Sequence, residues 1–121
     1  MRILVLTVIG LAMGTAGLHA APNLVAGRAL AIDACSACHQ VTTAQKPVSP
    51  VYNPDEHVSI AAPTFQAIAA KYARRPSALR RFILDPVHPM PEQRWNPADL
   101  NAVVAFIQSL HHAPSVPGEH P

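Results

Sequence analysis

The sequence predicts an all-α domain in which three main helices surround a bound group, with a long loop between the first helix and the second. Apolar residues recur at helical spacing in residues 65–72 and 100–110. Residues 41–62 hold three prolines and show no sustained period, which is typical of an irregular loop. Two explanations of this loop stay open: it covers one edge of a ligand with Tyr52 and Val58, or it is a tolerated surface insertion.

Each predicted helix has a recognisable start. Asn23 is a good N-cap for a first helix that runs into the two cysteines. Gly27 interrupts this helix, where glycine costs up to about 1 kcal/mol relative to alanine. Either a close helix crossing or simple tolerance explains it. A second helix follows Pro63, a third begins at Pro76, and the last begins after Asn96 and runs to about His111.

The two ends of the chain differ from its middle. Residues 1–20 have the pattern of an export signal, with Arg2, an apolar run and a small-residue end, so we expect cleavage near Ala20. An uncleaved anchor is the alternative, but the apolar run of eleven residues is shorter than the roughly 20 that cross a bilayer. The domain should then span residues 21–110, followed by a disordered, proline-rich tail over residues 111–121.

The predicted mature chain is small and weakly charged. Removing residues 1–20 leaves 101 of the 121 residues and lowers the formal net charge from +2 to +1. This charge identifies no partner, and we expect neither nucleic-acid binding nor a membrane span in the mature chain. Six aromatic residues make a thin core, so a bound apolar group would add to the stability of the native state.

Both cysteines of the chain lie in the segment Cys35-Ser36-Ala37-Cys38-His39. On a helical turn, thiols three residues apart and an imidazole four residues after the first share one face. This spacing is typical of haem attachment, in which the thiols add to the haem vinyl groups and the histidine binds the iron. A disulfide, a thioredoxin-like redox pair and a structural zinc site are the alternatives. They are weaker because no βαβ pattern is present and the other histidines are scattered.

Met90 and His88 compete for the sixth position of such a haem iron. Met90 lies between two prolines and is the only methionine after residue 20. Histidine is the stronger donor and would give a lower reduction potential than methionine. Close by in sequence, Trp95 has an indole N–H that needs an acceptor when buried, and a haem propionate would serve.

Positive charge is concentrated between residues 71 and 81. Such a run is either a solvated face or a docking patch for an acidic partner. Its five cations are Lys71, Arg74, Arg75, Arg80 and Arg81.

Four segments in order, ACSACH, APTFQAIAAKY, HPMP and DLNAVVAFIQSL, resemble a bacterial class I c-type cytochrome, a small monohaem electron carrier. The resemblance covers about residues 23–110. It implies that Gly27 and Phe106 meet where the terminal helices cross. It also implies one covalent haem c, attached through thioethers at Cys35 and Cys38. His39 and Met90 would be the axial iron ligands. The Pro63 carbonyl would accept a hydrogen bond from the imidazole, and Trp95 would donate one to a haem propionate.

The resemblance further implies a function. A periplasmic cytochrome of this kind is an electron carrier and not an enzyme, and its partners are redox proteins such as a dehydrogenase, an oxidase or a reductase. His/Met ligation suits this role because both axial positions stay filled in either oxidation state. Two alternatives stay open: a tethered haem subunit of a larger dehydrogenase or oxidase, and a small haem peroxidase, which needs an open sixth site.

Overall fold

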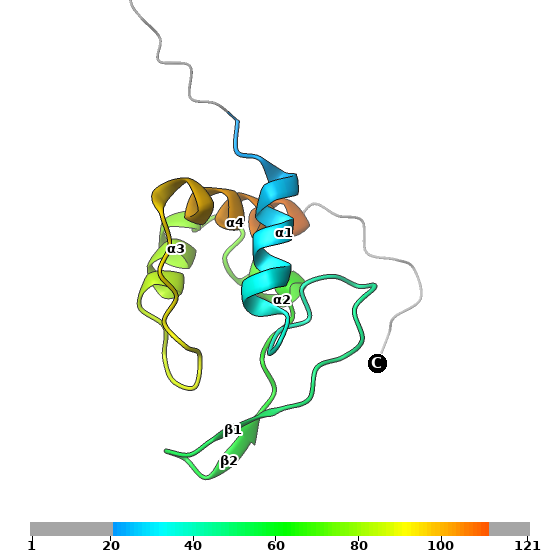
Figure 1. The fold of residues 1–121 in the computed structure, drawn as a ribbon, viewed down its shortest axis with the longest axis vertical. Helices are drawn as coiled ribbons and strands as arrows, with labels where there is room; N and C mark the ends of the chain where they lie inside the picture. Colours follow the sequence, from blue (N-terminus) through cyan, green and yellow to red (C-terminus); the bar gives the residue numbers. More distant parts are fainter. Residues whose placement is uncertain (1–20, 112–121) are drawn as a thin grey trace, which may run out of the picture.

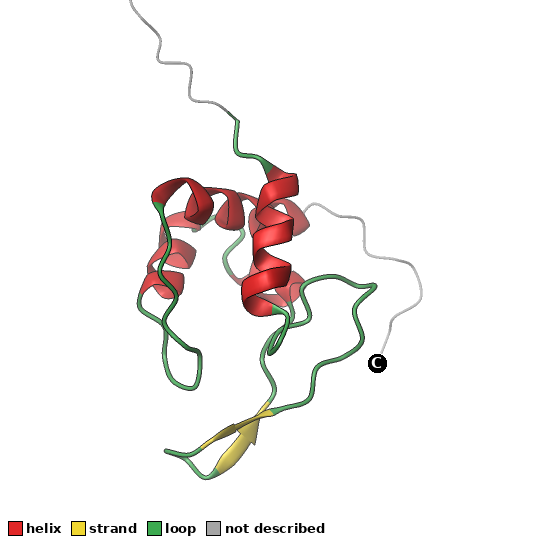
Figure 2. Cartoon of the chain, viewed as in Figure 1, coloured by secondary structure: helices red, strands yellow, loops and turns green. Residues whose placement is uncertain are grey.

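Four α-helices and one short β-hairpin form residues 21–111, the part of the chain that this computed structural model describes (Figures 1 and 2). The helices lie together, and the hairpin projects away from them. In chain order the elements are α1 (Leu24–Cys35), β1 (Val51–Asn53), β2 (Val58–Ile60), α2 (Phe65–Lys71), α3 (Pro76–Leu84) and α4 (Pro97–Leu110). Each of the four segments for which a helix start was predicted is therefore helical, and the all-α prediction is confirmed.

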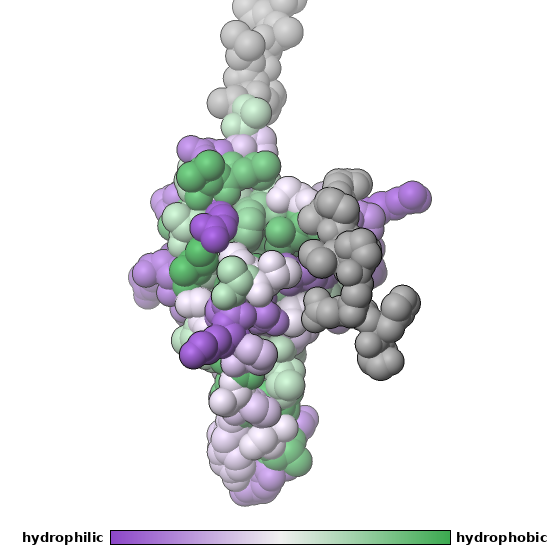
Figure 3. Space-filling view, turned by 90° about the vertical axis from the view of Figure 1, so that its right-hand side faces the viewer, coloured by the Kyte–Doolittle hydropathy of each residue, from purple (hydrophilic) through white to green (hydrophobic). Residues whose placement is uncertain are grey.

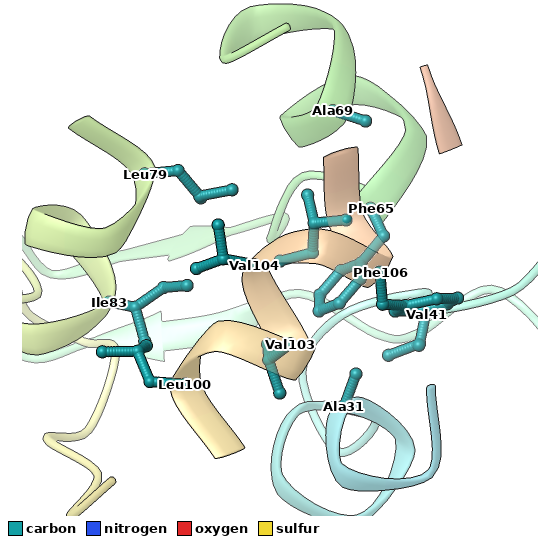
Figure 4. Packing of buried hydrophobic residues seen from close by; sticks show 11 residues of the cluster. Ala31, Val41, Phe65, Ala69, Leu79, Ile83, Leu100, Val103, Val104 and Phe106 are labelled. Carbon is teal, nitrogen blue, oxygen red and sulfur yellow. The ribbon is translucent and has the colours of Figure 1, made fainter. Parts of the chain in front are cut away.

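Helix α4 is the centre of the core. It begins at Pro97 because the Asn96 side chain accepts a hydrogen bond from the Asp99 N–H at 2.8 Å. Its apolar side chains point toward the other three helices, all of which pack against it (Figure 4). The buried members are Leu100, Ala102, Val103, Val104, Phe106 and Ile107.

Helix α1 crosses α4 at Gly27. The Asn23 side chain caps the helix by accepting the Ala26 N–H at 3.0 Å. A Cβ atom added at Gly27 would lie 2.1 Å from the carbonyl oxygen of Ala102 and 3.0 Å from Cβ of Phe106. The close helix crossing is therefore confirmed as the reason for this glycine.

Helices α2 and α3 close the core from the other side of α4. Thr64 caps α2 by accepting the Ala67 N–H at 3.2 Å, and Pro76 occupies the first turn of α3. Each of these two helices contributes buried side chains from its apolar face. The buried residues are Phe65, Ala69, Leu79 and Ile83.

The segment predicted to be an irregular loop contains a β-hairpin, so that prediction is wrong in part. Val51–Asn53 pairs antiparallel with Val58–Ile60, and Val51 lies opposite Ile60. The hairpin forms a narrow projection below the helical body (Figure 3). Each strand is three residues long, which is too short for a period of two to be visible in the sequence. His57 closes the turn in the left-handed region, at φ 54°.

The predicted export signal and most of the predicted tail lie outside the described residues. Within residues 21–111, no helix has both the length and the apolar character needed to cross a bilayer. His111 directly follows the last residue of α4, where the sequence predicted the helix to end.

Replacing Gly27 with alanine should destabilise the protein by about 3 kcal/mol, because the new methyl group meets backbone atoms that cannot rotate away. Denaturant unfolding of the purified protein measures this change. The control is Ala29→Ser, which enlarges an exposed position of the same helix and should change the free energy of unfolding by less than about 0.5 kcal/mol. Equal stability of Gly27→Ala and the wild type would contradict the crossing argument.

Candidate functional site

One apolar cavity of about 620 Å³ is lined by all six of the predicted haem-binding residues. It lies between the end of α1, the hairpin, α2, α3, the segment that follows α3, and α4. This volume is in the range of cofactor sites, about 300–1,000 Å³. The predicted site residues that line it are Cys35, Cys38, His39, Pro63, Met90 and Trp95.

The cysteine segment reaches the cavity because α1 ends at Cys35 and the chain then turns. The N–H groups of Cys38 and His39 both donate to the Cys35 carbonyl, at 3.2 and 2.9 Å. Both cysteines are free thiols and half-buried. Burial raises the pKa of the Cys35 thiol to about 11, and the neighbouring Cys38 adds to the rise. Cys35 therefore stays protonated at neutral pH, which makes it a poor nucleophile until its proton is removed.

The imidazole of His39 is oriented by a hydrogen bond to Pro63, which lies two residues before α2. Its Nδ1–H donates to the Pro63 carbonyl at 2.8 Å, which leaves Nε2 as the lone-pair nitrogen. The ring of Phe65 meets the imidazole edge-on, with centroids 5.8 Å apart. A backbone acceptor on Nδ1 is the usual way in which proteins fix a metal-binding histidine and raise its donor strength.

Met90 and His88 both line the cavity but have different surroundings. Met90 is half-buried, and its N–H donates to the Val87 carbonyl at 3.1 Å, which closes a turn. The side chain of His88 is 58% exposed, and its Nδ1 lies 3.1 Å from a carboxylate oxygen of Asp55 in the hairpin turn.

Trp95 supplies an independent indication of what the cavity holds. Its indole Nε1–H is buried and has no hydrogen-bond partner within the described chain. A buried donor without an acceptor costs about 1–3 kcal/mol, so such groups usually face a ligand or water. A haem propionate is an acceptor of the right chemistry, and the flat apolar macrocycle suits walls that include Leu79, Val103 and Ile107.

The alternative of a structural metal site has no support in the described residues. Among residues 21–111, no three histidine, cysteine, aspartate or glutamate side chains gather closely enough to hold a metal ion. A structural zinc site needs four such ligands.

The cytochrome c family model matches residues 24–111, from the first residue of α1 to the residue after α4. The chain belongs to the cytochrome c family. No curated protein and no solved structure matches it. As a cytochrome c, it takes a covalently bound haem c and works in haem-based electron transfer, which agrees with the thiols, the oriented imidazole and the unpaired indole in one cavity.

Of the two explanations left open for the loop, the one that places Tyr52 and Val58 at the edge of the ligand names the wrong residues of the hairpin. Val51 and Ile60 line the cavity, whereas Tyr52 and Val58 are 56% and 46% exposed. Adjacent strand residues point to opposite faces, so a pairing that puts Val51 inward turns Tyr52 outward. The sequence also gave no signal for Gln45, whose side chain binds the backbone of the haem-attachment segment.

Replacing both Cys35 and Cys38 with alanine should prevent cooperative folding of the cytochrome. The core contains few aromatic side chains, and without haem the apolar walls of the cavity of about 620 Å³ would face water. Circular dichroism and thermal melting of this variant measure the effect. Native helicity with a cooperative transition in the absence of haem would show that the haem does not organise the fold.

Proposed function

We propose that this cytochrome c is a periplasmic electron carrier, not an enzyme, whose single haem is attached through Cys35 and Cys38 and bound axially by His39 and Met90. The main support is that both thiols, the imidazole and the thioether line one apolar cavity. When bound, the haem would supply one-electron exchange, and His39 and Met90 would hold its iron in either oxidation state. The chain holds these ligands, excludes water from the iron and presents the site to redox partners.

The surroundings of His88 favour Met90 as the sixth ligand. The side chain of His88 is 58% exposed, and its Nδ1 lies 3.1 Å from a carboxylate oxygen of Asp55, which is itself 71% exposed, so the ring lies toward the hairpin turn and solvent. Met90 is half-buried at the cavity.

Methionine ligation favours an electron carrier over a peroxidase, because a peroxidase needs an open sixth position. The alternative of a tethered subunit depends on whether residues 1–20 are removed, which N-terminal sequencing of the exported protein decides.

The Met90→Ala variant should open the iron to added cyanide or carbon monoxide and lower the reduction potential, because the thioether favours the reduced iron. It should also abolish the weak red charge-transfer band of iron–thioether bonding in the oxidised protein. Visible spectroscopy and redox titration measure all three. His88→Ala is the matched control from the same turn and should leave them nearly unchanged. If His88→Ala opens the site and Met90→Ala does not, the protein is a bis-histidine cytochrome.

The cations between residues 71 and 81 do not form one uniform patch. Lys71 and Arg75 both lie over the ring of Tyr72, at 5.4 and 5.6 Å from its centroid, and Arg75 donates to the Lys71 carbonyl at 2.8 Å. Lys71 and Tyr72 line the cavity, so this positive charge lies at its rim. Arg80 instead donates to Asn101 of α4. We therefore propose that the Lys71–Arg75 end of the cluster meets acidic groups of a redox partner.

Charge reversal by Arg75→Glu should slow oxidation of the reduced protein by hexacyanoferrate(III) several-fold at low ionic strength. The anion is attracted by positive charge near the haem, and this attraction is screened over about 8–10 Å at physiological salt. Stopped-flow rates at low and high salt measure the effect. Arg28→Glu changes the net charge equally on the exposed side of α1 and should have a smaller effect. Equal rates for the two variants would leave the cluster as a solvated face.

A further inference from the structure

The side chain of Gln45 makes three hydrogen bonds to the backbone that carries the haem-attachment residues. Its Nε2–H₂ group donates to the carbonyl of Ser36 and to the carbonyl of His39, each at 3.0 Å. Its Oε1 accepts the Val41 N–H, also at 3.0 Å. The Gln45 amide thus links Ser36, at the end of α1, to His39 and Val41.

We propose that Gln45 is a positioning residue for the haem, which fixes the orientation of the His39 imidazole by holding the backbone of residues 36–41. This inference rests on the proposed binding of the iron by His39. Gln45 lies six residues beyond His39 and is not among the residues that line the cavity, so it acts through the backbone.

The backbone groups that bind the Gln45 side chain need a hydrogen-bond partner from a side chain. Ser36 is the C-cap of α1, and the last carbonyls of a helix have no partner within the helix. Val41 is fully buried, so its N–H cannot be satisfied by bulk water. The amide orientation follows from these groups, because a flipped amide would place its oxygen against two carbonyl oxygens and its NH₂ group against an N–H.

Gln45 is itself held by its own turn. Its N–H donates to the Thr42 carbonyl at 3.1 Å, and its carbonyl accepts the Gln40 side chain at 2.9 Å. The Gln40 carbonyl in turn accepts the N–H of Phe65 at 3.0 Å, and Phe65 lies two residues after Pro63, whose carbonyl binds the imidazole. Two contacts therefore hold His39: the Pro63 carbonyl binds its ring, and Gln45 binds its backbone. Release of the backbone contact would let the imidazole rotate about the remaining ring contact.

Gln45→Met tests this role because it removes all three hydrogen bonds at nearly constant side-chain volume. Gln108→Met is the matched control: it removes one glutamine-to-backbone hydrogen bond, of 3.0 Å to the Tyr72 carbonyl, at a similarly half-buried position away from the attachment segment. The readout is the set of shifted haem methyl NMR resonances of the oxidised holoprotein, since their pattern depends on the orientation of the axial imidazole plane.

We expect Gln45→Met to change the haem methyl pattern and to raise the unfolding equilibrium constant about tenfold or more. Gln108→Met should raise this constant less and leave the methyl pattern as in the wild type. Gln45→Glu should be at least as damaging as Gln45→Met, because it keeps an oxygen for Val41 but places another against two carbonyls. A wild-type methyl pattern in Gln45→Met, an equal change in Gln108→Met, or wild-type behaviour of Gln45→Glu overturns the proposal.

The wild-type protein decides the question if the variants do not fold. The Gln45 side-chain amide protons should exchange slowly with solvent and show NOE contacts to Ser36 and His39. Fast exchange without these contacts overturns the proposal. This measurement does not depend on haem ligation. A failure of the proposed function would be seen separately, because the visible spectrum of the wild-type protein would then show no haem or no iron–histidine bond.

Discussion

The close crossing of α1 and α4 determines where the haem-attachment segment lies. Gly27 lets the backbone of α1 approach Ala102, and Cys35 follows eight residues later, about 12 Å along the helix axis. On the α4 side, Val103 and Ile107 lie beside the crossing and form part of the cavity wall. The same contact therefore positions both the thiols and the surface that they face. A shift of the crossing would move the end of α1 relative to this wall.

Irregular segments complete the cavity that the helices begin. The hairpin contributes Val51 and Ile60, and the segment between α3 and α4 contributes Met90 and Trp95. These two segments meet through the contact between Asp55 and His88, although more than thirty residues separate them in the chain.

The sequence predicted the helices and the attachment motif because both depend on local patterns. The caps at Asn23, Thr64 and Asn96 form hydrogen bonds three residues ahead, and the C-x-x-C-H spacing lies within one turn. The hairpin was missed because a strand of three residues carries no period. Gln45 was missed for a different reason: its partners are backbone groups, which every residue has, so nothing in the sequence distinguishes it from other loop glutamines.

The two sides of the proposed iron site are held to different degrees. On the proximal side, the Pro63 carbonyl binds the His39 ring, Gln45 binds its backbone, and the buried Val41 anchors the turn. On the distal side, Met90 lies in a turn closed by the Val87 carbonyl, and the neighbouring contact between His88 and Asp55 is solvent-exposed, where such a pair contributes about 1 kcal/mol or less. A ligand held by several hydrogen bonds leaves the metal only when these bonds open together, whereas a ligand on an exposed turn leaves with the motion of the turn. Ligand exchange should therefore begin at Met90, while His39 stays bound to the iron.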